Sequence, residues 1–270
     1  MKYLNQIVCG EGSKLMGELP NECIDLTVTS PPYDDLRDYQ GYVFDFKSIA
    51  NELYRITKTG GVVVWVVGDT VIDYSESCTS SKQKLYFKEI GFNIHDTMIY
   101  EKNGVTSPDN TRYYQCFEYM FVLSKGRPKT INLIEDRKNR YTTKWGGGRK
   151  FREKDGSLSL RRNSYWGNDY GRRFNIWRYN TGAGYSTKDK IAFKHPAIFP
   201  EALAEDHIKS WSNIGDIVFD PMCGSGTVPK MAILLERNFI AFDISQQYMD
   251  LSRERIRPYQ EQGRLPYGAN

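Results

Sequence analysis

A glycine-rich turn in the C-terminal part of the sequence has the residue types of a cofactor site. The segment DIVFDPMCGSGTVPKMAILLERNFIAFD, residues 216–243, has the pattern of a strand, a turn, a helix and a second strand. Gly224 and Gly226 allow a tight turn and a close approach of the backbone to a ligand. Asp243 lies 17 residues after Gly226, near the offset at which a carboxylate binds a ribose diol in dinucleotide folds. Taken alone, the pattern fits either a cofactor site or a structural turn.

Three features of this turn indicate which cofactor it would bind. The third glycine of the NAD fingerprint is missing, and no Gly-Lys-Ser/Thr follows as in a phosphate-binding P-loop. A carboxylate at Asp220 would repel a pyrophosphate but attract a cationic ligand. We therefore predict S-adenosylmethionine, whose ammonium and sulfonium groups are positively charged.

A second motif, Ser30-Pro31-Pro32-Tyr33, follows the apolar run CIDLTVT. The two prolines fix the backbone and have no amide hydrogen to donate, and the tyrosine offers a flat ring. A proline turn that ends a strand has the same sequence features. The tetrapeptide alone therefore does not decide between a structural turn and a place where chemistry happens.

The segments around the two motifs indicate an α/β fold with a doubly wound, mostly parallel sheet. Valine-rich runs such as GGVVVWVVGD alternate with amphipathic stretches such as FDFKSIANELYRIT. We expect two halves of one domain, residues 1–124 with the tetrapeptide and residues 191–270 with the glycine turn. Residues 125–190 lose this periodicity, and we predict that they form an insertion.

The predicted insertion is strongly basic. Residues 125–190 contain 18 Lys and Arg against 6 Asp and Glu, a net charge of +12. Because the whole chain has a net charge of +4, the other residues together carry −8. The same segment contains ten aromatic residues. Basic side chains neutralise phosphates, and aromatic rings offer faces on which bases stack. This composition indicates a nucleic-acid partner, with a solvated basic loop region as the alternative.

The composition also argues against several other classes of protein. Five cysteines are scattered without CxxC or Cys/His spacing, so we expect neither a disulfide framework nor a metal site. The longest apolar run, VVVWVV, is far too short to span a membrane, and the N-terminus lacks a signal pattern. We predict a cytoplasmic protein without a membrane partner.

Together, the motifs resemble the S-adenosylmethionine-dependent amino-methyltransferases that modify the exocyclic amines of DNA bases. The catalytic tetrapeptide, a target-recognition segment and the cofactor turn follow one another in that family's permuted beta order. The resemblance covers nearly the whole chain. It implies a Rossmann-like class I methyltransferase fold, with residues 125–190 as an inserted segment that recognises the DNA target.

The resemblance assigns roles to residues by motif. The catalytic tetrapeptide of the family matches Ser30, Pro31, Pro32 and Tyr33. The cofactor loop matches Asp220, Pro221, Cys223, Gly224, Ser225, Gly226 and Thr227, of which we interpret Cys223 as a packing residue rather than a nucleophile. The HPAIFP motif, which lines the methionine end of the cofactor, supplies His195, Phe199 and Pro200. Asp243 matches the acid that binds the ribose of the cofactor. Glu11 replaces an aspartate that contacts the adenine amino group of the cofactor.

The chemistry that the resemblance implies explains the tetrapeptide. An exocyclic amine is a poor nucleophile because its lone pair is delocalised into the base. The Ser30 side chain and the Pro31 carbonyl would accept the two amino hydrogens and direct the lone pair at the sulfonium methyl. Tyr33 would stack on a base that has been flipped out of the duplex. Transfer would then be a direct displacement, in which alignment of the reacting atoms supplies most of the rate.

The motifs also bear on the target base. Serine at the first motif position and the HPAIFP segment resemble the cytosine-N(4) branch, so we predict N4-methylcytosine as the product. Adenine-N(6) methylation is the alternative, because both amines need the same two acceptors. Methylation of RNA or of a protein glutamine, and an inactive DNA-binding relative, are further alternatives. The expected partner is double-stranded DNA, and a homodimer, a cognate restriction endonuclease and the recognition sequence stay open.

Overall fold

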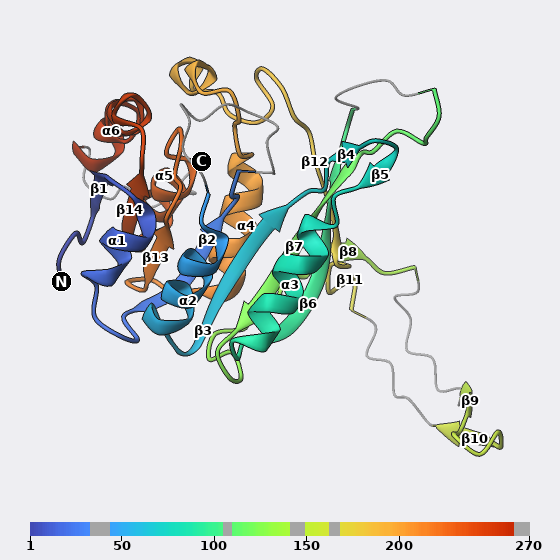
Figure 1. Cartoon of the computed structure of the whole chain (residues 1–270). Helices are drawn as coiled ribbons and strands as arrows, with labels where there is room; N and C mark the ends of the chain where they lie inside the picture. Colours follow the sequence, from blue (N-terminus) through green and yellow to red (C-terminus); the bar gives the residue numbers. More distant parts are fainter. Residues whose placement is uncertain (33–43, 105–109, 141–148, 162–167, 262–270) are drawn as a thin grey trace. The chain divides into compact units, whose positions relative to one another are not determined.

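The computed structural model describes residues 1–32, 44–104, 110–140, 149–161 and 168–261 (Figure 1). The chain divides into two compact units. One unit combines Met1–Asn132 with Asn175–Asn270, and the other is Leu133–Phe174. The glycine turn and the described part of the tetrapeptide both belong to the larger unit.

The larger unit is built on an eight-stranded sheet with the order β1-β14-β13-β2-β3-β7-β6-β12. In that order the strands are Gln6–Cys9, Asn238–Asp243, Ile217–Asp220, Ile24–Thr29, Thr57–Val67, Phe117–Ser124, Asn93–Lys102 and Ile176–Tyr179. Neighbouring strands are parallel except for the two pairs that include β7. The predicted α/β fold with a mostly parallel sheet is therefore confirmed.

From the two central strands β13 and β2, the next strand along the chain is added toward opposite edges of the sheet. Strand β13 is followed by helix α5 and then by β14 on one side, whereas β2 is followed by helix α2 and then by β3 on the other side. The boundary between β13 and β2 is thus a topological switch point. Open α/β sheets bind their ligands at the carboxyl ends of the strands at such a point.

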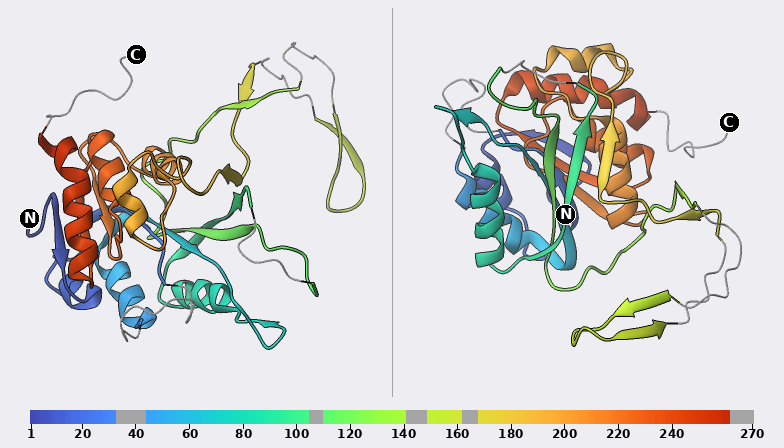
Figure 2. Two further views of the ribbon diagram at one scale, coloured as in Figure 1. Left: turned by 90° about the horizontal axis from the view of Figure 1, so that it is seen from above. Right: turned by 90° about the vertical axis from the view of Figure 1, so that its right-hand side faces the viewer.

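Helices cover both faces of the sheet (Figures 1 and 2). One face carries α1 (Gly12–Gly17), α2 (Phe46–Ile56) and α3 (Thr79–Glu89), and the other carries α4 (Glu201–Trp211), α5 (Thr227–Leu234) and α6 (Gln246–Glu261). A 3-10 helix, η1 (Lys190–Lys194), precedes α4, and a short hairpin of β4 (Val71–Ile72) and β5 (Ser75–Glu76) follows β3.

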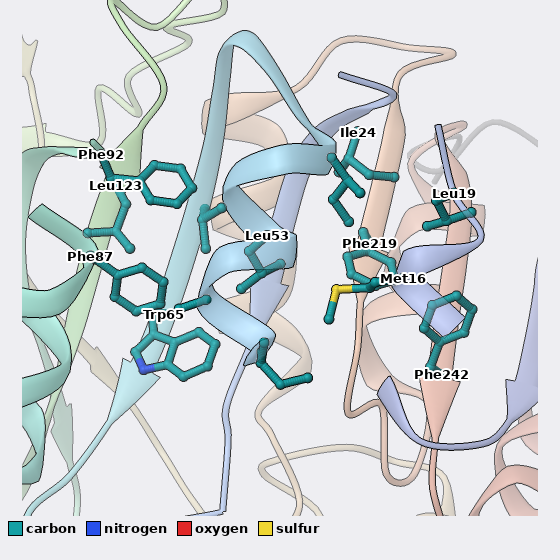
Figure 3. Packing of buried hydrophobic residues seen from close by; sticks show 14 of the residues in the cluster. Met16, Leu19, Ile24, Leu53, Trp65, Phe87, Phe92, Leu123, Phe219 and Phe242 are labelled. Carbon is teal, nitrogen blue, oxygen red and sulfur yellow. The ribbon is translucent and has the colours of Figure 1, made fainter. Parts of the chain in front are cut away.

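Helix α2 shows how the sequence pattern produces this packing. Asp45 caps its N-terminus by accepting a hydrogen bond from the Ser48 amide at 3.1 Å. Leu53, with no exposed surface, packs from the helix toward the sheet, in one apolar cluster with Trp65 of β3 and Phe87 of α3 (Figure 3). The Trp65 indole is buried as well, and its Nε1 donates to Gln83 Oε1 at 2.8 Å, so its polar atom is satisfied.

The described residues of the smaller unit include two short antiparallel ribbons. Strand β8 (Arg137–Lys138) pairs with β11 (Tyr170–Gly171), and β9 (Arg149–Arg152) pairs with β10 (Leu158–Arg161). This unit is shorter than the segment 125–190 that lost the α/β periodicity. The difference arises because β12 pairs with β6 along the edge of the main sheet. No helix in the described part of the chain is long and apolar enough to cross a membrane.

The packing of α2 leads to a prediction about stability. We expect Leu53→Ala to lower the free energy of unfolding by about 2–5 kcal/mol, because it removes a fully buried side chain and leaves a cavity. Leu85→Ala on α3 is the matched control, since Leu85 is 67% exposed and should change stability by no more than about 0.5 kcal/mol. Urea unfolding of both variants measures the difference. Equal losses would contradict the packing described for α2.

Candidate active site

The two motifs meet at the switch point of the sheet. Strands β13 and β2 are hydrogen-bonded neighbours, with Phe219 opposite Thr27. At their carboxyl ends, the Thr29 hydroxyl donates to Asp220 Oδ1 over 2.8 Å, and both residues are buried. Thr29, the last residue before the tetrapeptide, is therefore hydrogen-bonded to Asp220, the first residue of the glycine turn.

The tetrapeptide begins where β2 ends. Ser30 and Pro32 are half-buried and Pro31 is buried. Because β2 is held by β13 on one side and β3 on the other, the start of this turn is fixed at the centre of the sheet. Tyr33, the predicted stacking residue, lies outside the described residues.

Both glycines of the cofactor turn adopt conformations that favour glycine. The φ angles are +50° at Gly224 and +77° at Gly226. A Cβ on Gly224 would lie 2.8 Å from Nε2 of His195, and one on Gly226 would lie 2.6 Å from Oγ of Ser252. At both glycines, the group that lies close to the backbone is therefore a side chain of the protein. The glycines let the turn pack against the HPAIFP segment and against α6.

Asp243 lies at the end of β14 and is part of the turn's hydrogen-bonding network. Its Oδ2 accepts from the Gly224 amide and its Oδ1 from the Ser245 amide, both over 2.8 Å. Each carboxylate oxygen can accept a second hydrogen bond, so capacity remains for the hydroxyls of a ribose. The residue is 7% exposed, and burial raises the pKa of its carboxyl. The acceptor set fits the role predicted for Asp243.

Asp220 is more deeply buried. Burial raises the pKa of its carboxyl to about 7, the negative charge of Asp243 adds to this effect, and hydrogen bonds from Thr29 and the Met222 amide oppose it. A nearby cation would favour the charged form and lower this pKa. The turn therefore places an acid at the switch point whose ionisation would respond to a cationic ligand.

The HPAIFP segment lies directly against the cofactor turn. His195 is buried, and its ring packs edge-on against Tyr248 with 4.2 Å between the centroids. The Thr227 hydroxyl donates to the Phe199 carbonyl over 3.3 Å, and Pro200 is the N-cap residue of α4. The structure thus brings together the turn and the segment that the sequence predicted to line one cofactor.

The remaining predicted residues have structural roles around the same edge. Glu11 is the N-cap of α1 and accepts from the amides of Ser13 and Lys14, so its contact with an adenine amino group stays a prediction. Pro221 is buried. Cys223 is buried too, and burial raises the pKa of its thiol well above the ordinary value. A thiol that stays protonated is no nucleophile, which agrees with the predicted packing role.

Sequence reasoning missed a buried ion cluster behind the turn. It consists of Asp189, Glu201, Lys230 and Arg255. A signal was present, because Lys230 interrupts the otherwise apolar helix VPKMAILL and a lysine buried among apolar residues needs a charged partner. Its partners could not be found from the sequence, since they lie on other elements.

One hollow of the larger unit lies far from these residues. It has a volume of about 240 Å³ and is lined by Asp25, Lys58, Trp211 and Asp216 among others. These residues stand near the amino ends of β2, β3 and β13, at the opposite edge of the sheet. Among the described residues, no group of three or more His, Cys, Asp or Glu could hold a metal ion.

The packing of Gly226 against α6 can be tested with a matched pair of glycines. Gly226 and Gly184 have nearly the same φ, +77° and +79°, but an added Cβ meets Ser252 only at Gly226 and open space at Gly184. We expect Gly184→Ala to cost about 1 kcal/mol of stability from backbone strain and Gly226→Ala to cost clearly more. Thermal unfolding measures both. Equal losses would show that the turn does not pack on Ser252.

The raised pKa of Asp220 predicts a pH dependence of stability. Between about pH 4 and pH 7 the folded chain keeps a proton on Asp220 that the unfolded chain releases, so stability falls as the pH rises. The full effect of a pKa near 7 is a loss of roughly 4 kcal/mol. Asp220→Asn keeps the acceptor for Thr29 but cannot ionise, so its stability relative to the unaltered chain should be higher at pH 8 than at pH 5.

Urea unfolding at the two pH values measures this difference. Asp73→Asn, on the exposed turn between β4 and β5, is the control for a change of Asp to Asn. The two chains could instead differ in free energy of unfolding by the same amount at both pH values. That result would contradict the assigned environment of Asp220.

Comparison with known proteins identifies relatives over most of the chain. The family model N6_N4_Mtase, described as DNA methylase, matches residues 24–254. The orphan methyltransferase M.BamHII of Bacillus amyloliquefaciens is 58% identical over 250 residues, which cover 90% of this chain and 93% of that protein.

Solved structures share the fold. The PvuII DNA methyltransferase, which is cytosine-N4-specific, aligns with a TM-score of 0.65 at 17% identity, over 95% of this chain and 91% of its own. TTHA0409 of Thermus thermophilus, in complex with S-adenosyl-L-methionine, aligns with a TM-score of 0.61 at 21% identity, over 94% and 95%. Because the family model matches most of the chain and M.BamHII is closely similar over nearly its full length, this chain belongs to the N6/N4 DNA methylase family.

Proposed function

We propose that this protein transfers a methyl group from S-adenosylmethionine to the N4 amine of a cytosine in DNA, with release of S-adenosylhomocysteine and of one proton from the amine to solvent. The observation that carries the proposal is the buried hydrogen bond between Thr29 and Asp220. It brings the Ser30-Pro31-Pro32 turn next to the glycine turn at the switch point of the sheet. A group that binds the amine and a site for the methyl donor are thereby neighbours.

The glycine turn supports the donor side of the proposal. Asp243 would accept the ribose hydroxyls, and Asp220 would face the positive charge of the donor, with His195 and Phe199 beside them. When bound, S-adenosylmethionine supplies an electrophilic methyl group on a sulfonium. The buried carboxyl of Asp220 needs a cation nearby to be fully ionised at neutral pH, and such a donor carries one.

The proline turn supports the acceptor side. In this proposal the Ser30 hydroxyl and the Pro31 carbonyl each accept one hydrogen of the target amine, which draws the nitrogen lone pair out of conjugation. The prolines have no amide hydrogens that would compete for these acceptors. Tyr33, outside the described residues, would stack on the flipped base.

The smaller unit supports DNA as the substrate. Leu133–Phe174 contains 12 Lys and Arg against 5 Asp and Glu. Lys150, Arg152 and Lys154 on its β9–β10 ribbon are exposed, so their charges are available to phosphates. A protein substrate such as a glutamine amide would not need this charge. Steep weakening of binding between low and moderate salt would distinguish DNA from a protein substrate.

The choice of cytosine rests on the serine at position 30 and on the HPAIFP segment, which resemble the cytosine-N(4) branch. The cytosine-N4 specificity of the PvuII DNA methyltransferase supports the same choice. M.BamHII is named an orphan methyltransferase, which favours a chain that acts without a cognate restriction endonuclease.

The direct test is to incubate DNA with the protein and S-adenosylmethionine, digest it, and identify the methylated nucleoside by mass spectrometry. We expect N4-methylcytosine. Only 6-methyladenine would contradict the assigned base, and no methylated nucleoside would contradict the proposed function.

The role of Ser30 gives a second prediction. Ser30→Ala should lower kcat by roughly 10- to 100-fold, because the amine loses a hydrogen bond worth about 1–3 kcal/mol. Binding of S-adenosylmethionine, measured by calorimetry, should stay the same. Ser75→Ala, at an exposed position on β5, is the control and should leave both quantities unchanged. An unaltered kcat in Ser30→Ala would show that another group accepts the amino hydrogen.

A further inference from the structure

The buried ion cluster behind the glycine turn is balanced in charge. Lys230 Nζ lies 2.7 Å from both Asp189 Oδ2 and Glu201 Oε1. Arg255 contacts the same two atoms, with Nε 2.8 Å from Asp189 and Nη2 2.6 Å from Glu201. The two basic residues are less than 5% exposed. The two buried cations are therefore balanced by two half-buried carboxylates, as buried charges must be.

Arg255 does more than complete this cluster. Its Nη1 donates to the Ser225 carbonyl at 2.8 Å, to the Ser225 hydroxyl at 3.1 Å and to the Thr227 hydroxyl at 3.0 Å. Ser225 stands between the two glycines of the cofactor turn, and Thr227 opens α5. The contacts of Lys230, in contrast, are with the two carboxylates and the ring of Tyr259. One planar guanidinium thus joins the charge cluster to the turn.

The same contacts join the turn to the HPAIFP segment. Asp189 precedes this segment and Glu201 follows Pro200 directly. One turn before Arg255 on α6, the Ser252 hydroxyl donates to the Gly224 carbonyl over 2.7 Å. Helix α6 therefore holds the backbone of the turn at two successive residues, while α5 has no side-chain cap of its own at Gly226.

We propose that Arg255 is a positioning residue, which holds the cofactor turn and the segment 195–200 in the arrangement that binds the methyl donor. This inference rests on the proposed function. A lysine at position 255 keeps the positive charge but loses the planar fork that reaches both carboxylates and Ser225 at once.

The test measures binding of S-adenosylmethionine by calorimetry and steady-state kinetics for Arg255→Lys. We expect the Kd and the KM for S-adenosylmethionine to rise roughly tenfold or more, with the KM for DNA unchanged. Arg253→Lys is the matched control on the same helix, because Arg253 donates to the Ile7 carbonyl and does not contact the turn. It should change the Kd less than about twofold. A folded Arg255→Lys with an unchanged Kd, or with the same change as the control, would overturn the proposal.

A double-mutant cycle separates positioning from general stability. Thr227→Val removes one acceptor of Arg255. As a single substitution, we expect it to raise the Kd for S-adenosylmethionine. Combined with Arg255→Lys, it should raise the Kd no further than Arg255→Lys does alone. Additive effects would overturn the proposal. If Arg255→Lys does not fold, the single variants Thr227→Val and Ser225→Ala test the proposal. An unchanged Kd for S-adenosylmethionine in both variants would overturn it. Absence of binding to the unaltered chain would instead contradict the proposed function, and this inference would fall with it.

Discussion

The hydrogen bond from Thr29 to Asp220 is the contact on which the rest of the site depends. It joins residues that are 191 positions apart in the sequence and lie on neighbouring strands. Because the carboxyl of Asp220 is buried, it needs this donor and the Met222 amide, and the ends of β2 and β13 are held together as a result. The proline turn and the glycine turn extend from these two strand ends, and Asp243 lies at the end of the neighbouring strand β14. The turn that we propose to bind the amine begins with Ser30, and the turn that we propose to bind the donor begins at Asp220.

The backbone of the glycine turn is held by contacts with other elements as well as by its own sequence. Two glycines with positive φ allow His195 and Ser252 to pack directly against the backbone. Asp243 accepts the Gly224 amide, and α6 binds the carbonyls of Gly224 and Ser225. A turn that is held at so many points can present its remaining acceptors to a ligand without a large loss of conformational entropy on binding. Preorganisation of this kind is what an alignment-dependent displacement requires.

Much of this arrangement could be predicted from the sequence, because local patterns determine it. The apolar runs and the GxG turn predicted the parallel sheet, the turn and the position of Asp243 at a strand end. The extent of the inserted unit was harder to predict, since the short strand Ile176–Tyr179 has no pattern that separates it from the basic loops around it. Arg255 was missed for a similar reason. Its sequence context, LSRERIR, resembles a solvated helix face, and only the tertiary structure shows that this arginine is buried against Asp189 and Glu201.

In the proposed site, the methyl donor lies between the ends of β13, β14 and β2. A crystal structure of the chain with S-adenosylhomocysteine tests it most directly. We expect a ligand whose ribose hydroxyls contact Asp243, whose amino acid end lies near Asp220, and whose sulfur faces Ser30 and Pro31. A ligand bound elsewhere, such as in the hollow beside Lys58 and Trp211 at the opposite edge of the sheet, would contradict it.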